Sequence, residues 1–132
     1  EQRAADRTDW DKTVTPFGVK LREMRAAKGT TLKEMAKALL VSSAYLSALE
    51  HGRRGRPSRA LLYDICTYFN IIWDEAEELE RLAQLSHPRA VVDTAGLSAD
   101  ATELANRLAD SIADLPEETI QRMLAEVRPS TK

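Results

Sequence analysis

Apolar residues recur every three or four positions along most of the chain, the spacing that places them on one face of a helix. Pro16 suits a helix start, and Gly29 suits a helix end because glycine adopts the left-handed backbone conformation at least cost. The pattern predicts a first helix over residues 16–28. Its inward positions are Phe17, Leu21 and Met24.

Two short amphipathic helices are predicted next. Thr31 and Glu34 match a capping box, in which each side chain accepts a hydrogen bond from the backbone N–H of the other residue, so a helix begins just after Thr31. Ser42 or Ser43 can cap the second helix with its hydroxyl, and Gly52 ends it. The inward positions are Leu32, Met35, Ala36 and Leu39 in one helix and Tyr45, Leu46 and Leu49 in the other.

The outer face of the second short helix is small and uncharged. It consists of Ser43, Ala44, Ser47, Ala48 and His51. Such a face fits close approach to a DNA major groove, where hydroxyls bond to base edges and methyl groups contact thymine. Small residues also suit helix–helix packing, so the face alone does not exclude an ordinary helical bundle.

A run of arginines follows this helix, with Arg53, Arg54, Arg56 and Arg59 inside seven residues. Four guanidinium groups repel one another unless water, carboxylates or phosphates neutralise them, and arginine is well suited to bidentate phosphate contact. A solvated basic loop is the alternative. Together with the helix pair, the run favours binding to double-stranded DNA.

Residues 31–57 resemble the Xre-type, lambda-repressor-like helix-turn-helix family of bacterial and phage transcription regulators. The residues that carry the resemblance are Ala36, Val41, Ser42, Tyr45, Leu46, Ser47, Glu50, Gly52 and Pro57. The likeness extends over residues 17–73, somewhat under half of the chain. It implies an all-α, five-helix DNA-binding domain.

The resemblance also implies which residues contact DNA. Residues 43–51 would form the recognition helix in the major groove, and residues 31–33 would lie over the DNA backbone. The expected backbone contacts are Thr31, Lys33, Arg53, Arg54, Arg56 and Arg59. The rest of the expected interface is Ser42, Ser43, Ala44, Tyr45, Ser47, Ala48 and His51.

Three positions depart from the family pattern. Leu40 stands where glycine is common, and a left-handed backbone there costs a leucine about 1–2 kcal/mol. Leu32 replaces a common glutamine, and serines and alanines replace long base-reading side chains. The hypothesis that follows is recognition by groove shape, with Arg54 or Arg56 entering a narrow A·T-rich minor groove.

Charge is distributed unevenly along the chain. Residues 16–60 hold ten lysines and arginines against three acidic residues, whereas residues 61–132 hold six against fourteen, so the net charge of −2 hides a basic segment. DNA senses the local field, because salt screens charges beyond about 8–10 Å. The basic side is expected to include Lys20, Arg22, Arg25, Lys28, Lys33, Lys37 and the four arginines of the run.

The DNA-binding domain is expected to span residues 16–86, after a polar arm at residues 1–15. Two further helices complete it, over residues 59–69 and 74–85, the second capped by Asp74. Trp73 is expected to fill the core between them.

Residues 87–132 have a different character. Residues 87–98 predict an extended linker or a short edge strand at Ala90 to Asp93, followed by a helix capped by Ser98 and a last helix beginning at Pro116. Two short helices with one apolar face each bury little by themselves. We therefore expect this region to form a homodimer, since paired helix-turn-helix domains read palindromic operators.

Other site types find little support. The single cysteine, Cys66, excludes an internal disulfide and lies at a packing position, and His51 and His87 lack companion metal ligands. No catalytic constellation or phosphate loop is evident, so we expect no enzyme, cofactor or metal. No leader or long apolar run occurs, which predicts a cytoplasmic, nucleoid-associated protein with no membrane partner.

Two other functions remain open. In an antitoxin, residues 87–132 would bind a toxin, and a toxin-like gene beside this one would favour that function. In a ligand-responsive regulator the same region would hold an effector, although no convergent polar cluster identifies one. The sequence does not distinguish repression from activation.

Overall fold

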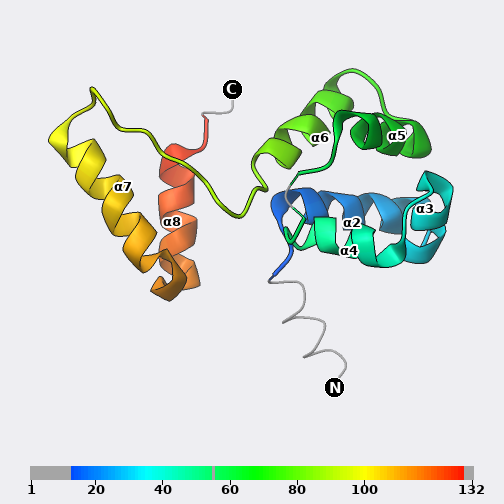
Figure 1. Cartoon of the computed structure of the whole chain (residues 1–132), viewed down its shortest axis with the longest axis horizontal. Coiled ribbons are helices and arrows are strands. Elements are labelled where there is room, and N and C mark those ends of the chain that lie inside the picture. The colour runs from blue at the N-terminus through cyan, green and yellow to red at the C-terminus, as the bar shows by residue number, and fades with distance from the viewer. Residues whose placement is uncertain (1–12, 55, 130–132) are drawn as a thin grey trace. The chain divides into compact units, whose positions relative to one another are not determined.

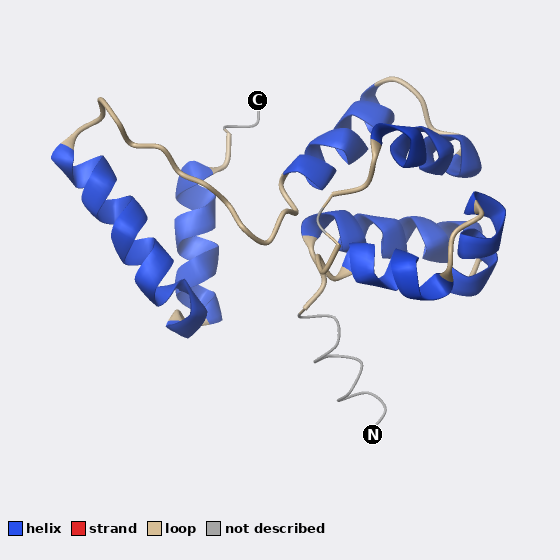
Figure 2. Cartoon of the chain, in the orientation of Figure 1, coloured by secondary structure: helices blue, strands red, loops and turns tan. Residues whose placement is uncertain are grey.

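The computed structural model describes residues 13–54 and 56–129, which form helices joined by turns and loops, without a strand (Figures 1 and 2). The predicted all-helical class is confirmed. The chain divides into two compact units, residues 1–90 and 91–132. The first contains α2 (Pro16–Lys28), α3 (Leu32–Leu39), α4 (Ser43–Glu50), α5 (Arg59–Phe69) and α6 (Asp74–Gln84), and the second contains α7 (Ala99–Ser111), the 3-10 helix η1 (Ile112–Asp114) and α8 (Glu117–Val127).

Local side chains set the helix boundaries in the first unit. The Thr31 hydroxyl accepts from the Glu34 N–H at 3.0 Å, and the Thr31 N–H donates to Glu34 Oε1 at 2.9 Å, so the predicted capping box is present. Ser42, rather than Ser43, caps α4 by accepting from the Tyr45 N–H at 3.0 Å. Gly29 ends α2 with a φ of 75°.

The core belongs to the first unit, where α2 packs against α4 and α6 while α3 packs against α4 and α5. A buried hydrogen bond closes this arrangement, since the Phe17 N–H donates to Ser86 Oγ at 2.8 Å. The Ser86 hydroxyl in turn donates to the Leu82 carbonyl at 2.6 Å. The buried apolar residues are Phe17, Leu21, Met35, Ala36, Leu39, Leu46, Leu49, Leu61, Ile65, Leu79 and Ala83.

Gly18 allows α2 to approach the end of α4 closely. A Cβ atom at this position would overlap the backbone carbonyl oxygen of Glu50 and the side chain of Val14. Backbone groups do not move aside as the end of a flexible side chain does, so the contact requires glycine. This close approach helps to fix α4 relative to α2.

Trp73 corrects two expectations. The side chain is 79% exposed rather than buried in the core. Asn70 takes a left-handed conformation with a φ of 58°, after which Ile71 packs against the core instead. Asp74 is the first residue of α6, and Trp73 occupies the N-cap position without a side-chain cap bond.

The second unit carries no buried residue in α7 or α8. Ser98 caps α7 as predicted, accepting from the Ala101 N–H at 3.1 Å, and Pro116 is the N-cap of α8. Residues 90–93 form no strand, which leaves the extended linker of the two predicted alternatives. None of the helices in the described ranges is long and apolar enough to cross a membrane.

Candidate nucleic-acid interface

The turn between α3 and α4 depends on Leu40. This residue has a φ of 62° and a ψ of 38°, and the following Val41 N–H donates to the Ala36 carbonyl at 3.0 Å. The Leu40 side chain is 91% exposed, so it adds almost nothing to the core. The turn therefore keeps the left-handed geometry that glycine usually supplies, at the energetic cost of a leucine.

The two sides of α4 have opposite environments. Leu46, Leu49 and Glu50 are buried against the first unit, whereas Ser43 and Ala44 in the first turn are exposed. Ser47 and Ala48 on the following turn are half-buried. The small uncharged face therefore points outward most fully at the N-terminal end of α4.

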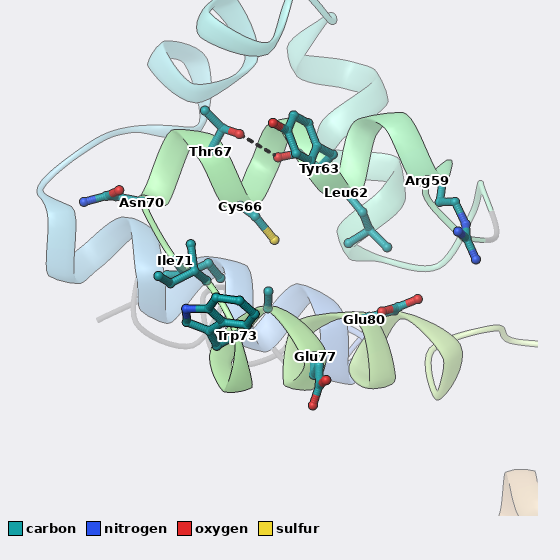
Figure 3. A pocket seen from close by; sticks show the side chains of 12 residues that line it. Arg59, Leu62, Tyr63, Cys66, Thr67, Asn70, Ile71, Trp73, Glu77 and Glu80 are labelled. Atoms are coloured by element: carbon teal, nitrogen blue, oxygen red, sulfur yellow. Dashed lines mark hydrogen bonds between the residues drawn. The ribbon is translucent and has the colours of Figure 1, made fainter.

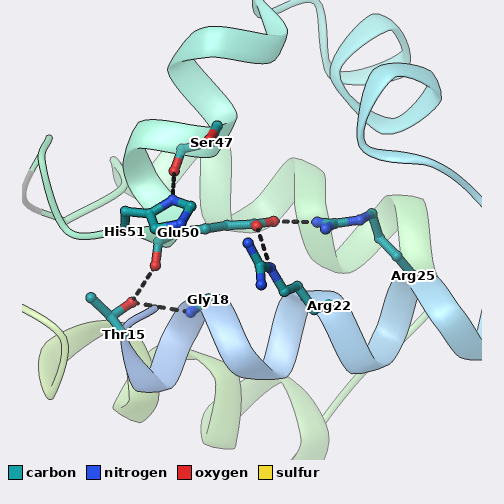
Figure 4. A network of polar contacts seen from close by, with 7 residues as sticks. All are labelled: Thr15, Gly18, Arg22, Arg25, Ser47, Glu50 and His51. Carbon is teal, nitrogen blue, oxygen red and sulfur yellow. Dashed lines mark hydrogen bonds and ion pairs between the residues drawn. The ribbon is translucent and has the colours of Figure 1, made fainter. Parts of the chain in front are cut away.

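Glu50 fixes the C-terminal end of α4 to α2 (Figure 4). Its side chain is 1% exposed and accepts from Arg22 Nε at 3.3 Å and from Arg25 Nη1. Its backbone carbonyl accepts from the Thr15 N–H at 2.9 Å and from the Thr15 hydroxyl at 3.0 Å. The last residue of α4 is thus held by charge-assisted side-chain bonds and by backbone bonds together.

Arg22 and Arg25 do not belong to the exposed basic surface, which corrects the expectation from the charge count. Their side chains are 17% and 11% exposed and are directed toward Glu50. A signal for this was present in the sequence, because Glu50 lies four residues after inward-facing Leu46 and the two arginines share one face of α2 by their i, i+3 spacing. Sequence reasoning missed the pairing because the two helices are not adjacent in the sequence.

The family comparison agrees with this geometry. The family described as "Helix-turn-helix domain" matches residues 16–82, about half of the chain. The chain belongs to the helix-turn-helix family. The resemblance seen in the sequence is confirmed at that level, and α3 and α4 with the turn at Leu40 are the helix-turn-helix.

Two curated relatives carry similar domains. The uncharacterized HTH-type transcriptional regulator RghRB of Bacillus subtilis is 33% identical over 61 residues, which cover 46% of this chain and 44% of that protein. The transcriptional regulator ClgR of Mycobacterium tuberculosis is 33% identical over 87 residues, which cover 62% of this chain and 77% of that protein. The chain therefore spans less than half the length of RghRB. No solved structure gave a significant match.

The arginine run follows the helix-turn-helix directly. Gly52 takes a φ of 78°, and the Arg53 N–H donates to the Ala48 carbonyl at 2.9 Å, so the chain turns sharply out of α4. Arg54 lies over the Tyr45 ring, 5.6 Å from its centroid. All four arginines of the run are exposed, namely Arg53, Arg54, Arg56 and Arg59. Within the described ranges none of them takes part in an ion pair.

The start of the first helix of the helix-turn-helix already holds an anion. Glu34 Oε1 accepts from the Thr31 N–H and from the Thr30 hydroxyl, and the bond from the Thr31 backbone lowers the pKa of the Glu34 carboxyl. A DNA phosphate at this helix end would meet that carboxylate. Thr31 and Lys33 beside this carboxylate are both exposed.

His51 differs from the other predicted interface residues. Its Nδ1 lies 2.8 Å from the Ser47 carbonyl oxygen, and since a carbonyl only accepts, Nδ1 carries the hydrogen (Figure 4). The ring is half-buried and turned back along its own helix. Of the predicted set the structure exposes Thr31, Lys33, Ser42, Ser43, Ala44 and the four arginines, and it leaves Tyr45, Ser47, Ala48 and His51 partly covered.

Proposed function

We propose that this chain is a transcription regulator of Xre type that binds double-stranded DNA in a sequence-specific manner, on the chromosome in the cytoplasm. The main support is the exposed first turn of α4, which is anchored at its other end by buried Glu50 and followed directly by an exposed arginine run. A helix held in this way can enter a major groove, because its small outward face approaches the base edges and the adjacent cations contact the phosphates.

The interface residues divide into two roles. Thr31, Lys33 and the four arginines contact phosphates and fix the register of the helix on the duplex. Ser43, Ala44 and Ser47 approach base edges, with Tyr45 and Ala48 behind them. Because these side chains offer few donors and acceptors, groove shape contributes to specificity, and Arg54 or Arg56 enters an A·T-rich minor groove beside α4.

The second unit supplies dimerisation. Residues of α7, η1 and α8 line an apolar hollow of about 420 Å³, whose members include Leu104, Leu108, Ile120 and Leu124. Because no residue of α7 or α8 is buried, this face lacks the core that a stable helix pair needs. A second copy of residues 87–132 covers it, and the resulting homodimer reads a palindromic operator with the DNA-binding domains of residues 16–86.

Selection from a random-sequence DNA library with the 132-residue chain tests the DNA-binding function. The expected product is an inverted repeat with half-site centres about 34–36 Å apart. Arg53→Ala should weaken binding to every sequence and lower the salt slope by about one unit, whereas Ser43→Val should change the preferred sequence. Arg89→Ala, an exposed arginine outside the proposed interface, is the control. No enrichment of any sequence would exclude specific recognition.

Sedimentation tests the dimer separately. The 132-residue chain should sediment as a dimer and its Leu124→Glu variant as a monomer, because a carboxylate in the apolar hollow has no partner. Leu40→Glu, at an exposed position outside residues 87–132, should remain dimeric. A monomeric parent chain would contradict the homodimer and leave the hollow for a different protein.

A further inference from the structure

Two hollows adjoin one another at α5 and α6 in the first unit. One has a volume of about 610 Å³ and the other about 530 Å³. They share Arg59, Leu62 and Glu80, so they form one continuous groove with two different ends. The size of either hollow is in the range of small-molecule sites, about 300–1,000 Å³.

The first end of the groove is apolar. Leu62 and Cys66 point from α5 toward α6, and Trp73 lies near Ile71 at the far end, while the Glu77 carboxylate points away (Figure 3). Burial and the charge of Glu80 raise the pKa of the Cys66 thiol, which keeps it neutral. This end therefore suits an aliphatic or aromatic body.

Trp73 is strained at this end of the groove. Its φ of 56° and ψ of −121° lie outside the regions that side-chain-bearing residues usually adopt. Core packing does not explain the strain, since the indole is largely exposed. Strained residues of this kind concentrate at ligand sites, where the backbone holds a side chain in place for a partner.

The second end is cationic. Arg54, Arg56 and Arg59 line it together with His87, and Glu80 is the carboxylate that lines it. Counting the three guanidinium groups against this carboxylate leaves an excess of positive charge. Within the described part of the chain these guanidinium groups form no ion pair. They can therefore donate bidentate hydrogen bonds to an anionic group at this end.

We infer that this groove binds a small amphiphilic anion, with its apolar body against Trp73 and Leu62 and its carboxylate, sulfonate or phosphate group at the three arginines. In the proposed function the same arginines contact DNA phosphates. An effect of the ligand on DNA binding therefore rests on that function. Because one guanidinium set cannot serve both anions fully, the ligand lowers the affinity for DNA, and DNA lowers the affinity for the ligand. The molecule is then a regulator released from DNA by its ligand.

Fluorescence of Trp73 in the Trp10→Phe variant of the 132-residue chain measures ligand binding without DNA. The probes are octanoate, octan-1-ol and octyltrimethylammonium, which share the apolar chain and differ in the head group. Octanoate should change the emission in a saturable manner. It should bind about fivefold more tightly than the alcohol, which is the gain in affinity expected from a strong ion pair that water can still reach. Equal binding of all three probes, or no response to octanoate, overturns the inference.

Two variants locate the site. Ile72→Glu places a carboxylate at the exposed edge of the apolar end and should abolish the octanoate response, whereas Val91→Glu, on the linker outside the groove, should retain it. Arg59→Gln should weaken octanoate binding by part of this factor, about twofold, and leave the alcohol unaffected. Unfolding midpoints close to that of the parent chain show that the variants are folded. Retention of the full octanoate response by Ile72→Glu would place the ligand elsewhere and overturn the inference.

The regulatory step is measured on the selected DNA site. Octanoate at ten times its half-saturating concentration should weaken DNA binding about tenfold if the two compete fully. Binding of octanoate with unchanged DNA affinity would overturn the coupling but keep the ligand site. A chain that binds no DNA in the absence of octanoate would instead overturn the proposed function, while the fluorescence result still decides the groove.

Discussion

Replacement of Glu50 by glutamine tests how the second helix of the helix-turn-helix is held. The substitution keeps the shape of the side chain but removes the charge that faces Arg22 and Arg25. Breaking a fully buried ion pair costs about 3–5 kcal/mol. Since the two arginine side chains are still 17% and 11% exposed, partial rehydration should lower this to about 2–4 kcal/mol.

Urea unfolding followed by circular dichroism measures this loss in Glu50→Gln against the parent chain. A loss of this size is a large part of the 5–15 kcal/mol that stabilises a typical domain. Glu23→Gln is the matched control, because Glu23 lies on α2 and is exposed, and it should change the free energy of unfolding by less than about 0.5 kcal/mol.

A double-mutant cycle separates the ion pair from other effects of the substitution. Arg25→Gln and Glu50→Gln should each destabilise the chain, and the double variant should lose clearly less than the sum of the two losses, because the Arg25–Glu50 ion pair is then removed only once. If Glu50→Gln costs no more than Glu23→Gln, or if the losses simply add, the ion pair does not hold α4 to α2 and the reasoning is wrong.

Three further changes test local features of the first unit. Leu40→Gly should stabilise the chain by about 0.5–1 kcal/mol in urea unfolding, because it relieves the left-handed strain of a leucine whose side chain is almost fully exposed. Ala38→Gly in the preceding helix is the control and should destabilise the chain by about 1 kcal/mol. A loss of stability in both variants would contradict the strain at the turn. Gly18→Ala should destabilise by about 1–3 kcal/mol, since the added methyl group overlaps the Glu50 carbonyl, and an unchanged unfolding midpoint would show that the helices separate without cost. The pKa of the Glu34 carboxyl, followed by NMR, should lie below the ordinary value of 4.5. Because the pKa is lowered in the folded state, the stability that this group contributes is present above the unfolded pKa and is lost as pH falls through the folded pKa. A pKa at or above 4.5 would argue against the capping box in solution.

The sequence alone determined the elements whose causes lie within a few residues. The capping box at Thr31, a serine cap at position 42 or 43, the Ser98 cap and the helix end at Gly29 all join groups no more than four positions apart. Apolar spacing likewise predicted the buried faces of α2, α3 and α4. These features follow from helical geometry and need no knowledge of the rest of the fold.

Only the tertiary structure decided which polar groups meet across the fold. Glu50 pairs with arginines 25 and 28 positions away, and the Phe17 N–H bonds to Ser86, 69 positions away. The i, i+3 spacing of Arg22 and Arg25 and the inward position of Glu50 were visible in the sequence, but the sequence did not show that these groups meet, because a charged side chain turns inward only where a buried partner offsets its desolvation. Trp73 shows the converse: its size indicated the core, but Ile71 packs against the core instead and the indole lies at the surface, where it lines the groove.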